Sequence, residues 1–123
     1  MDVKINIVDD VLAKVVITGE VSVFDEDFAL LSKELMAYVK LGIYRFIIDI
    51  DRVTYIDSSG VGLIIRLATA AMKKETMVCV FCGQPNVLRV FTVSSVDRII
   101  KFIEDEAEGV KYFKEETGLV LKS

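Results

Sequence analysis

At the middle of the chain stands the run Phe46-Ile47-Ile48-Asp49-Ile50, which is apolar on both faces at its start. A strand that buries both faces belongs in the centre of a sheet that helices cover on each side. A helix is expected to follow over about Ser58–Lys74. A buried strand followed by a helix is the building unit of α/β folds, whose strands are largely parallel.

Upstream of this run, two short patterns predict a β-hairpin. Val3, Ile5 and Ile7 alternate with polar residues, as in a half-buried strand. A second strand is expected over Leu12–Thr18, with Ala13, Val15 and Ile17 on one face. The intervening turn at Asp9-Asp10 is short, so the two strands should pair antiparallel.

A helix is expected between this hairpin and the central strand. Asp25 is a plausible N-cap, and Gly42 is a natural C-terminal stop. The apolar residues of this segment recur at helical spacing, at Phe28, Leu31, Leu35 and Val39.

The rest of the chain continues the alternation of strands and helices. It predicts a buried strand over Met77–Cys82, a short helix opened by Pro85, an edge strand over Ile99–Ile103 and a helix over Glu104–Glu116. The order is therefore ββαβαβαβα, and alternating strands and helices require crossover connections. The sequence predicts a single domain over residues 1–123, an α/β sandwich with helices packed on a mixed sheet of about five strands.

Composition narrows the class of protein. Hydrophobic residues make up 53% of the 123 residues and charged residues 28%, which excludes bulk disorder. The apolar runs fall far short of the roughly 18 residues that a membrane span requires, and Met1-Asp2-Val3-Lys4 does not resemble a signal peptide. We expect a soluble cytoplasmic protein. The net charge of −4 argues against nucleic acid and anionic membrane as partners.

The chain contains no histidine. Its absence removes Ser-His and Cys-His catalysis and all His-ligated metal sites. The pair Cys79 and Cys82 has the spacing of a redox or zinc half-site, but both residues lie in an apolar strand, where residues three apart point to opposite faces. We interpret them as structural, reduced thiols. No catalytic residue, metal site or cofactor is predicted.

The motif Asp57-Ser58-Ser59-Gly60-Val61-Gly62 joins the central strand to its helix. Asp57 can cap the helix by accepting an N–H from Ser59 or Gly60, which leaves Ser58 pointing outward. Each glycine costs the helix about 1 kcal/mol relative to alanine. Close packing on the sheet would explain one glycine, and approach of a partner to Ser58 would explain the other.

Together with Gly19-Glu20-Val21 and Arg45-Phe46-Ile47-Ile48-Asp49-Ile50, the stretch Ile56–Gly62 resembles the bacterial anti-sigma factor antagonists of the STAS domain family. The resemblance extends over most of the chain. It implies that Ser58 is phosphorylated by an anti-sigma factor that is itself a serine kinase, and that a PP2C-type phosphatase restores the serine. It also implies that the unphosphorylated form binds the anti-sigma factor and frees the sigma factor, so the protein is a switch and not an enzyme.

The expected partner-binding residues are Asp57, Ser58, Ser59, Gly60, Gly62 and Ser22. Ser22 stands where family members often carry an acidic residue, so the contact made there is open. Two alternatives remain. The domain could be a constitutive STAS scaffold or a subunit of a stress-signalling or transporter complex. Alternatively, Asp9-Asp10 with Asp49 or Asp51 could form the magnesium site of an aspartate-phosphorylated receiver, although the predicted hairpin opposes it.

Overall fold

A computed structural model of the protein describes residues 1–8, 10–93 and 96–117. The strands are β1 (Asp2–Val8), β2 (Leu12–Val21), β3 (Arg45–Ile56), β4 (Val78–Phe81) and β5 (Ile100–Ile103). The helices are α1 (Phe28–Lys40), α2 (Ser58–Met72), α3 (Pro85–Thr92) and α4 (Glu106–Thr117), with a 3₁₀ turn at Val96–Arg98 that the sequence analysis did not predict. The predicted order of strands and α-helices is confirmed.

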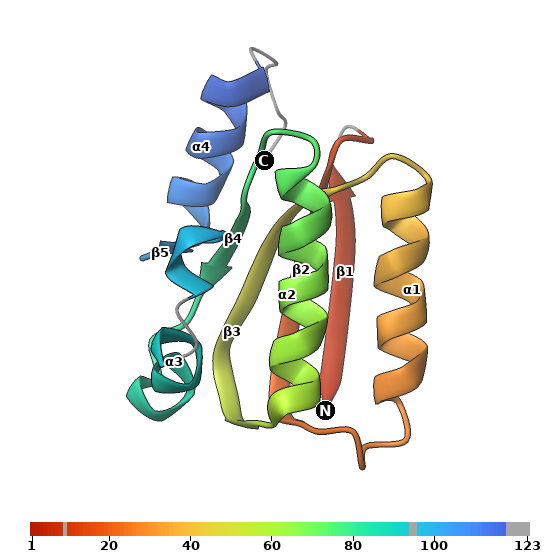
Figure 1. Ribbon diagram of the computed structural model, residues 1–123, viewed down its shortest axis with the longest axis vertical. Coiled ribbons are helices and arrows are strands. Elements are labelled where there is room, and N and C mark those ends of the chain that lie inside the picture. The colour runs from red at the N-terminus through yellow and green to blue at the C-terminus, as the bar shows by residue number, and fades with distance from the viewer. Residues whose placement is uncertain (9, 94–95, 118–123) are drawn as a thin grey trace.

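The five strands form one mixed sheet in the order β1-β2-β3-β4-β5 (Figure 1). β1 and β2 form the predicted antiparallel hairpin, and every later pairing is parallel. β3 is central and β5 lies at an edge, as expected. The predicted turn residue Asp9 lies outside the described residues, whereas Asp10 occupies the turn with a positive φ of 58°.

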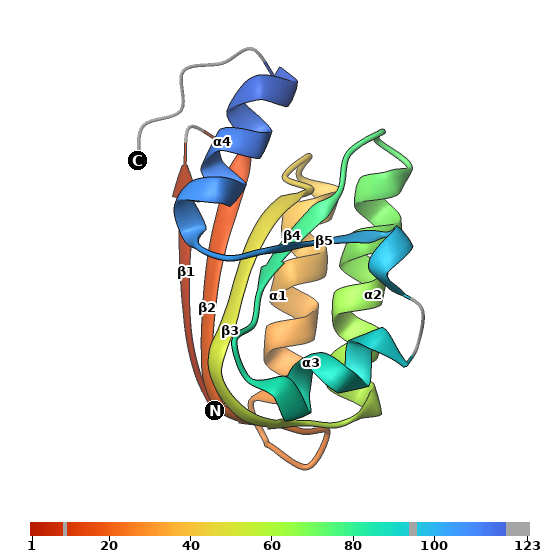
Figure 2. The same ribbon diagram turned by 90° about the vertical axis from the view of Figure 1, so that its left-hand side faces the viewer.

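Helices cover both faces of the sheet, but unequally. Figure 2 shows α1, α2 and α3 on one face and α4 across one end of the other. The alternation within β3 matches these layers, because Phe46 and Ile48 join the core beneath α1 and α2 while Ile47 packs with Phe113 of α4. The apolar pattern gives way to the half-buried Asp49 on the face of Ile47, as period-2 alternation requires. The strand is therefore apolar on both faces only at its start, because α4 covers only that part of the second face.

The predicted strand Met77–Cys82 is shorter than expected, since β4 ends at Phe81, but the two cysteines still pack on opposite sides, as predicted. Cys79 packs in the cluster beneath α4, and Cys82 packs partly buried against the larger core. Both thiols are free. Burial raises the pKa of Cys79 to about 12 and also raises the pKa of Cys82, so neither thiol is activated.

Several element boundaries differ from the predictions. β3 continues to Ile56, since its second half pairs with the end of β2. α1 does not use Asp25 as its N-cap: the cap is Asp27, which makes no side-chain cap bond. Asp25 instead accepts the Asp27 N–H at 2.8 Å and so orders the turn before the helix. Gly42 ends α1 as expected, with a φ of 92° that favours glycine.

α4 begins two residues later than expected. The Asp105 carboxylate accepts the N–H of Glu108 at 2.8 Å, a contact typical of an N-cap side chain. The helix therefore starts at Glu106, and its first turn contains Glu106 and Glu108 where the helix dipole favours acids.

Candidate functional site

The candidate site lies where β3 enters α2. Asp57 has the extended backbone of an N-cap, and its Oδ1 accepts the N–H of Gly60 at 3.0 Å. The predicted capping role of Asp57 is therefore confirmed. α2 runs for 15 residues from Ser58, so its aligned peptide dipoles leave partial positive charge at this end.

Asp57 also joins two loops that are far apart in sequence. Its Oδ2 accepts the backbone N–H of Val23 at 2.9 Å, and its own N–H donates to the carbonyl of Val21 at 3.0 Å. Val23 belongs to the loop between β2 and α1. Figure 1 shows this loop and the start of α2 together at the same end of the molecule, near the N-terminus. The carboxylate thus fixes the β2–α1 loop against the helix that Ser58 opens.

The hydrogen-bond donors around Asp57 decide its charge state. Desolvation alone would raise the pKa of Asp57. The Val23 and Gly60 amides, the Ser22 hydroxyl and the Ser59 amide together outweigh that effect and lower the pKa below its ordinary value. Asp57 therefore stays ionised at neutral pH, with its oxygens committed to donors within the fold.

Ser58 and Ser59 differ in accessibility. Ser58, the first residue of α2, is exposed, whereas Ser59 is half-buried. Ser22 lies half-buried in the neighbouring loop, where its Oγ accepts the N–H of Phe24 at 3.1 Å. The structure therefore brings Ser22, Asp57, Ser58 and Ser59 into one region, with Ser58 the more accessible of the two adjacent hydroxyls.

The two glycines of the motif have separate roles. A Cβ on Gly60 would lie 2.7 Å from Ile56 and 2.8 Å from Val21, so this glycine lets α2 pack closely on the sheet. Gly60 is buried in the isolated chain, and its membership of the partner-binding surface stays a prediction. A Cβ on Gly62 would meet nothing within 4 Å, so Gly62 leaves open space on the other side of the helix.

The loop that Asp57 holds was not predicted from the sequence. Val23 and Phe24 are both exposed, and Phe24 is 93% exposed. At the end of this loop Asp25 also pairs with the Met1 ammonium at 3.2 Å. The sequence does contain one signal for this loop, the aromatic residue Phe24 directly before the acidic run Asp25-Glu26-Asp27. That pattern does not reveal which surface the loop adjoins.

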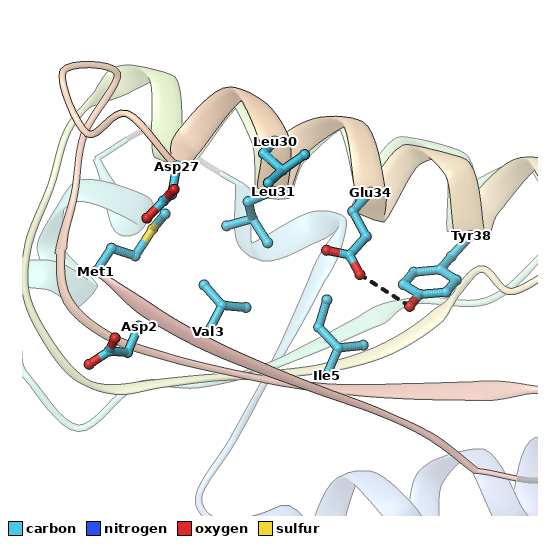
Figure 3. Close-up of a pocket in the computed structure, with 9 residues that line it drawn as sticks. All are labelled: Met1, Asp2, Val3, Ile5, Asp27, Leu30, Leu31, Glu34 and Tyr38. Carbon is cyan, nitrogen blue, oxygen red and sulfur yellow. Dashed lines mark hydrogen bonds between the residues drawn. The ribbon is translucent and has the colours of Figure 1, made fainter.

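A groove of about 390 Å³ lies between β1 and α1 (Figure 3). Figure 3 shows Val3 and Ile5 of β1 below the side chains of α1, where the Tyr38 hydroxyl donates to Glu34 at 3.4 Å. The lining residues are Met1, Asp2, Val3, Ile5, Asp27, Leu30, Leu31, Glu34 and Tyr38. The groove contains none of the predicted site residues, so it is separate from the Ser58 surface.

The structure does not assemble the receiver-type acidic site from its described members. Asp10 lies in the hairpin turn before Leu12, whereas Asp49 pairs with Val16, about 13 Å further along the strand. Asp51 is engaged elsewhere, since its Oδ1 accepts the Gly83 N–H at 2.8 Å. Among the residues that the structure describes, no group of three or more Cys, Asp or Glu side chains could hold a metal ion.

No helix in the described ranges combines the length and the apolar character that crossing a membrane takes.

Similar architectures occur among solved structures. The anti-sigma factor antagonist SpoIIAA in its unphosphorylated form superposes with a TM-score of 0.78 at 18% identity, covering 97% of this chain and 99% of that chain. The phosphorylated form of SpoIIAA, a Bacillus cell fate determinant, gives 0.72 at 18% identity, with coverages of 89% and 97%. An anti-sigma factor antagonist from Mycobacterium paratuberculosis gives 0.72 at 20% identity, with coverages of 89% and 91%.

At these identities the structural similarity establishes the fold. No curated protein matches the sequence significantly. The family model of the STAS domain, however, matches residues 3–109, which span the sheet except for Asp2, the first three α-helices and the start of α4. This chain therefore belongs to the STAS domain family.

Proposed function

We propose that this protein is an anti-sigma factor antagonist that phosphorylation of Ser58 switches off. In its unphosphorylated form it binds an anti-sigma factor and thereby frees a sigma factor in the cytoplasm. The anti-sigma factor acts as the serine kinase, and a PP2C-type phosphatase reverses the modification. The protein itself is a substrate and a binding partner and carries out no catalysis.

One observation carries this proposal: Ser58 is exposed at the N-terminus of α2, directly after a carboxylate that is engaged within the fold. In the transfer, Ser58 Oγ attacks the γ-phosphorus of ATP held by the kinase. The bond from that phosphorus to ADP breaks, ADP leaves, and the hydroxyl proton passes to a base on the kinase. A phosphate at this position meets the positive end of the helix dipole, so the fold tolerates it.

The same phosphate opposes a docked complex. It adds a charge of about −1.5 to −2 beside the ionised Asp57. An uncompensated charge buried in an interface costs on the order of 3–5 kcal/mol. Moving an equilibrium from almost fully bound to almost fully free takes about 5.5 kcal/mol. One phosphate therefore supplies much of the required change without unfolding the protein.

Intact-mass and phosphopeptide analysis tests the proposal. The purified protein is incubated with Mg²⁺-ATP and the anti-sigma factor kinase of the same organism, and then with a PP2C-type phosphatase. We expect one phosphoryl group on Ser58, which the phosphatase removes. Ser58→Ala should block the modification, whereas the matched variant Ser59→Ala should retain it, because Ser59 is half-buried.

Binding of the same variants separates a switch from a scaffold. A switch binds the anti-sigma factor as Ser58→Ala and loses it as Ser58→Glu. If both variants bind a partner equally well, or if no phosphate forms on Ser58 under any condition, the protein is a constitutive scaffold. In that case the capping contacts of Asp57 are sufficient to explain the motif.

A further inference from the structure

The aromatic side chain of Phe24 is exposed to solvent. It is 93% exposed, more than any other large hydrophobic residue in the described part of the chain. Exposed apolar area is unfavourable in water. Burying the Phe24 side chain against a partner would therefore contribute favourable free energy to binding that the fold of the isolated chain does not use. A single exposed apolar residue needs no explanation by itself, so the setting of Phe24 decides whether it has a role.

The backbone around Phe24 is fixed by hydrogen bonds. Val23 N–H donates to Asp57 Oδ2 at 2.9 Å, and Phe24 N–H donates to Ser22 Oγ at 3.1 Å. Asp25 N–H donates to the Ser22 carbonyl at 3.0 Å. The aromatic ring thus projects from an ordered turn, which lowers the entropic cost of docking it into a pocket.

The position of this turn makes it continuous with the Ser58 surface. Val23 bonds directly to Asp57, the residue before Ser58. Figure 1 shows the β2–α1 and β3–α2 connections at the same end of the molecule. Val23, the residue before Phe24, is itself 53% exposed. A partner that covers Ser58 therefore comes close to the exposed apolar side chains Val23 and Phe24 of the β2–α1 connection.

Acidic residues in the loop of Phe24 and at the end of β2 indicate the chemistry of the partner. Glu26 and Asp27 follow Phe24 and are exposed, and Glu20, which pairs with Tyr55 across the strands, is exposed as well. An anionic lipid surface would be repelled by these carboxylates. A protein pocket with an apolar floor and a rim of lysine or arginine would match both the ring and its surroundings.

We infer that Phe24 is the binding anchor for the anti-sigma factor kinase, and that it inserts into an apolar pocket with a basic rim beside the kinase's contact with Ser58. This inference rests on the proposed function and names a residue outside the phosphorylation motif. Asp57 acts as a positioning residue, because it holds the turn that presents the ring.

Isothermal titration of the purified anti-sigma factor kinase with the unphosphorylated protein tests the inference. Phe24→Ser should weaken binding by roughly 10- to 100-fold, the range expected when a buried aromatic anchor is lost. Phe24→Leu should retain most of the affinity, because it keeps an apolar side chain. Binding of the wild type should weaken as added salt screens the attraction between the acidic residues near Phe24 and the basic rim of the kinase pocket.

Leu41→Ser is the matched control. Leu41 is 76% exposed but lies beyond the C-terminal end of α1, about 20 Å along that helix from the Phe24 turn. Leu41→Ser should bind within about two-fold of the wild type. Phe24→Ser should unfold at the wild-type temperature, since the ring contributes little to the core.

The outcomes distinguish this inference from the proposed function. If Phe24→Ser binds like the wild type while Ser58→Glu does not bind, the inference is wrong and the proposed function stands. If Phe24→Ser and Leu41→Ser weaken binding equally, the loss of affinity does not depend on the position of the substituted residue. The inference that Phe24 is the anchor is then also wrong. Failure of the wild type to bind the kinase overturns both. A wild-type dimer that Phe24→Ser dissociates in the absence of the kinase overturns the inference alone, because the ring then contacts a second copy of this chain.

Discussion

The Oδ2 atom of Asp57 accepts the backbone N–H of Val23 at 2.9 Å, across 34 residues of sequence. The other carboxylate oxygen accepts the Gly60 N–H at 3.0 Å. One side chain therefore starts the helix that carries Ser58 and fixes the neighbouring turn. Since each oxygen serves a different segment, substitutions at position 57 can separate the two roles.

We expect Asp57→Ala to destabilise the protein by about 1–3 kcal/mol, because it removes the helix cap and leaves the Val23 amide without its acceptor. Asp57→Asn should cost less, since one amide oxygen can still cap the helix. Urea unfolding at neutral pH measures both changes. Equal stability of Asp57→Ala and the wild type would show that the two contacts contribute nothing in solution.

The contribution of Asp57 should depend on pH. Its pKa is lowered in the folded protein, so its stabilising effect is present above the ordinary value of 3.8 and is lost as the pH falls through the folded pKa. The stability difference between the wild type and Asp57→Asn should therefore be largest near neutral pH and shrink in acid. Urea midpoints measured from pH 7 down to pH ~2.5 test this sign. A difference that grows in acid would contradict the lowered pKa.

The two glycines of the motif should respond oppositely to alanine. Gly60→Ala places a methyl group 2.7–2.8 Å from Ile56 and Val21, and we expect a loss of about 1–3 kcal/mol from overpacking. Gly62→Ala places its methyl group in open space, so helix propensity should increase stability by up to about 1 kcal/mol. Thermal unfolding of the pair provides a matched comparison. Similar losses for both variants would argue against the close packing of α2 at Gly60.

The cysteines should be unreactive in the folded state. Burial raises the pKa of Cys79 to about 12, so almost no thiolate exists at pH 8, and the side chain is fully buried. Iodoacetamide should label Cys79 only after unfolding, as peptide mass analysis would detect. The partly buried Cys82 serves as the internal comparison, and we expect it to be labelled first. Rapid labelling of Cys79 in the native protein would mean that the packing beneath α4 opens readily.

Local patterns predicted most of the fold. Alternation in β1 and β2 and the short turn between them were sufficient for the hairpin, and the doubly apolar start of β3 was sufficient to place it centrally. The ends of the helices were harder to predict from the sequence. Asp25 is a good capping residue by type, but its carboxylate accepts the Asp27 N–H within the turn before the helix and also pairs with the Met1 ammonium. The contact with Met1 depends on where the chain returns, and local sequence does not reveal it.

The sequence by itself determined the order of elements, the cap at Asp57 and the placement of Ser58 at a helix start, because these depend on residues within one turn or one strand of each other. Only the tertiary structure decided that Gly60 faces the sheet while Gly62 faces open space. It also decided that Asp57 reaches Val23, and that the exposed Phe24 follows a residue bonded to the helix cap. The physical reason is the parallel pairing of β2 with β3, which brings the ends of the two strands together, and no local periodicity encodes that meeting.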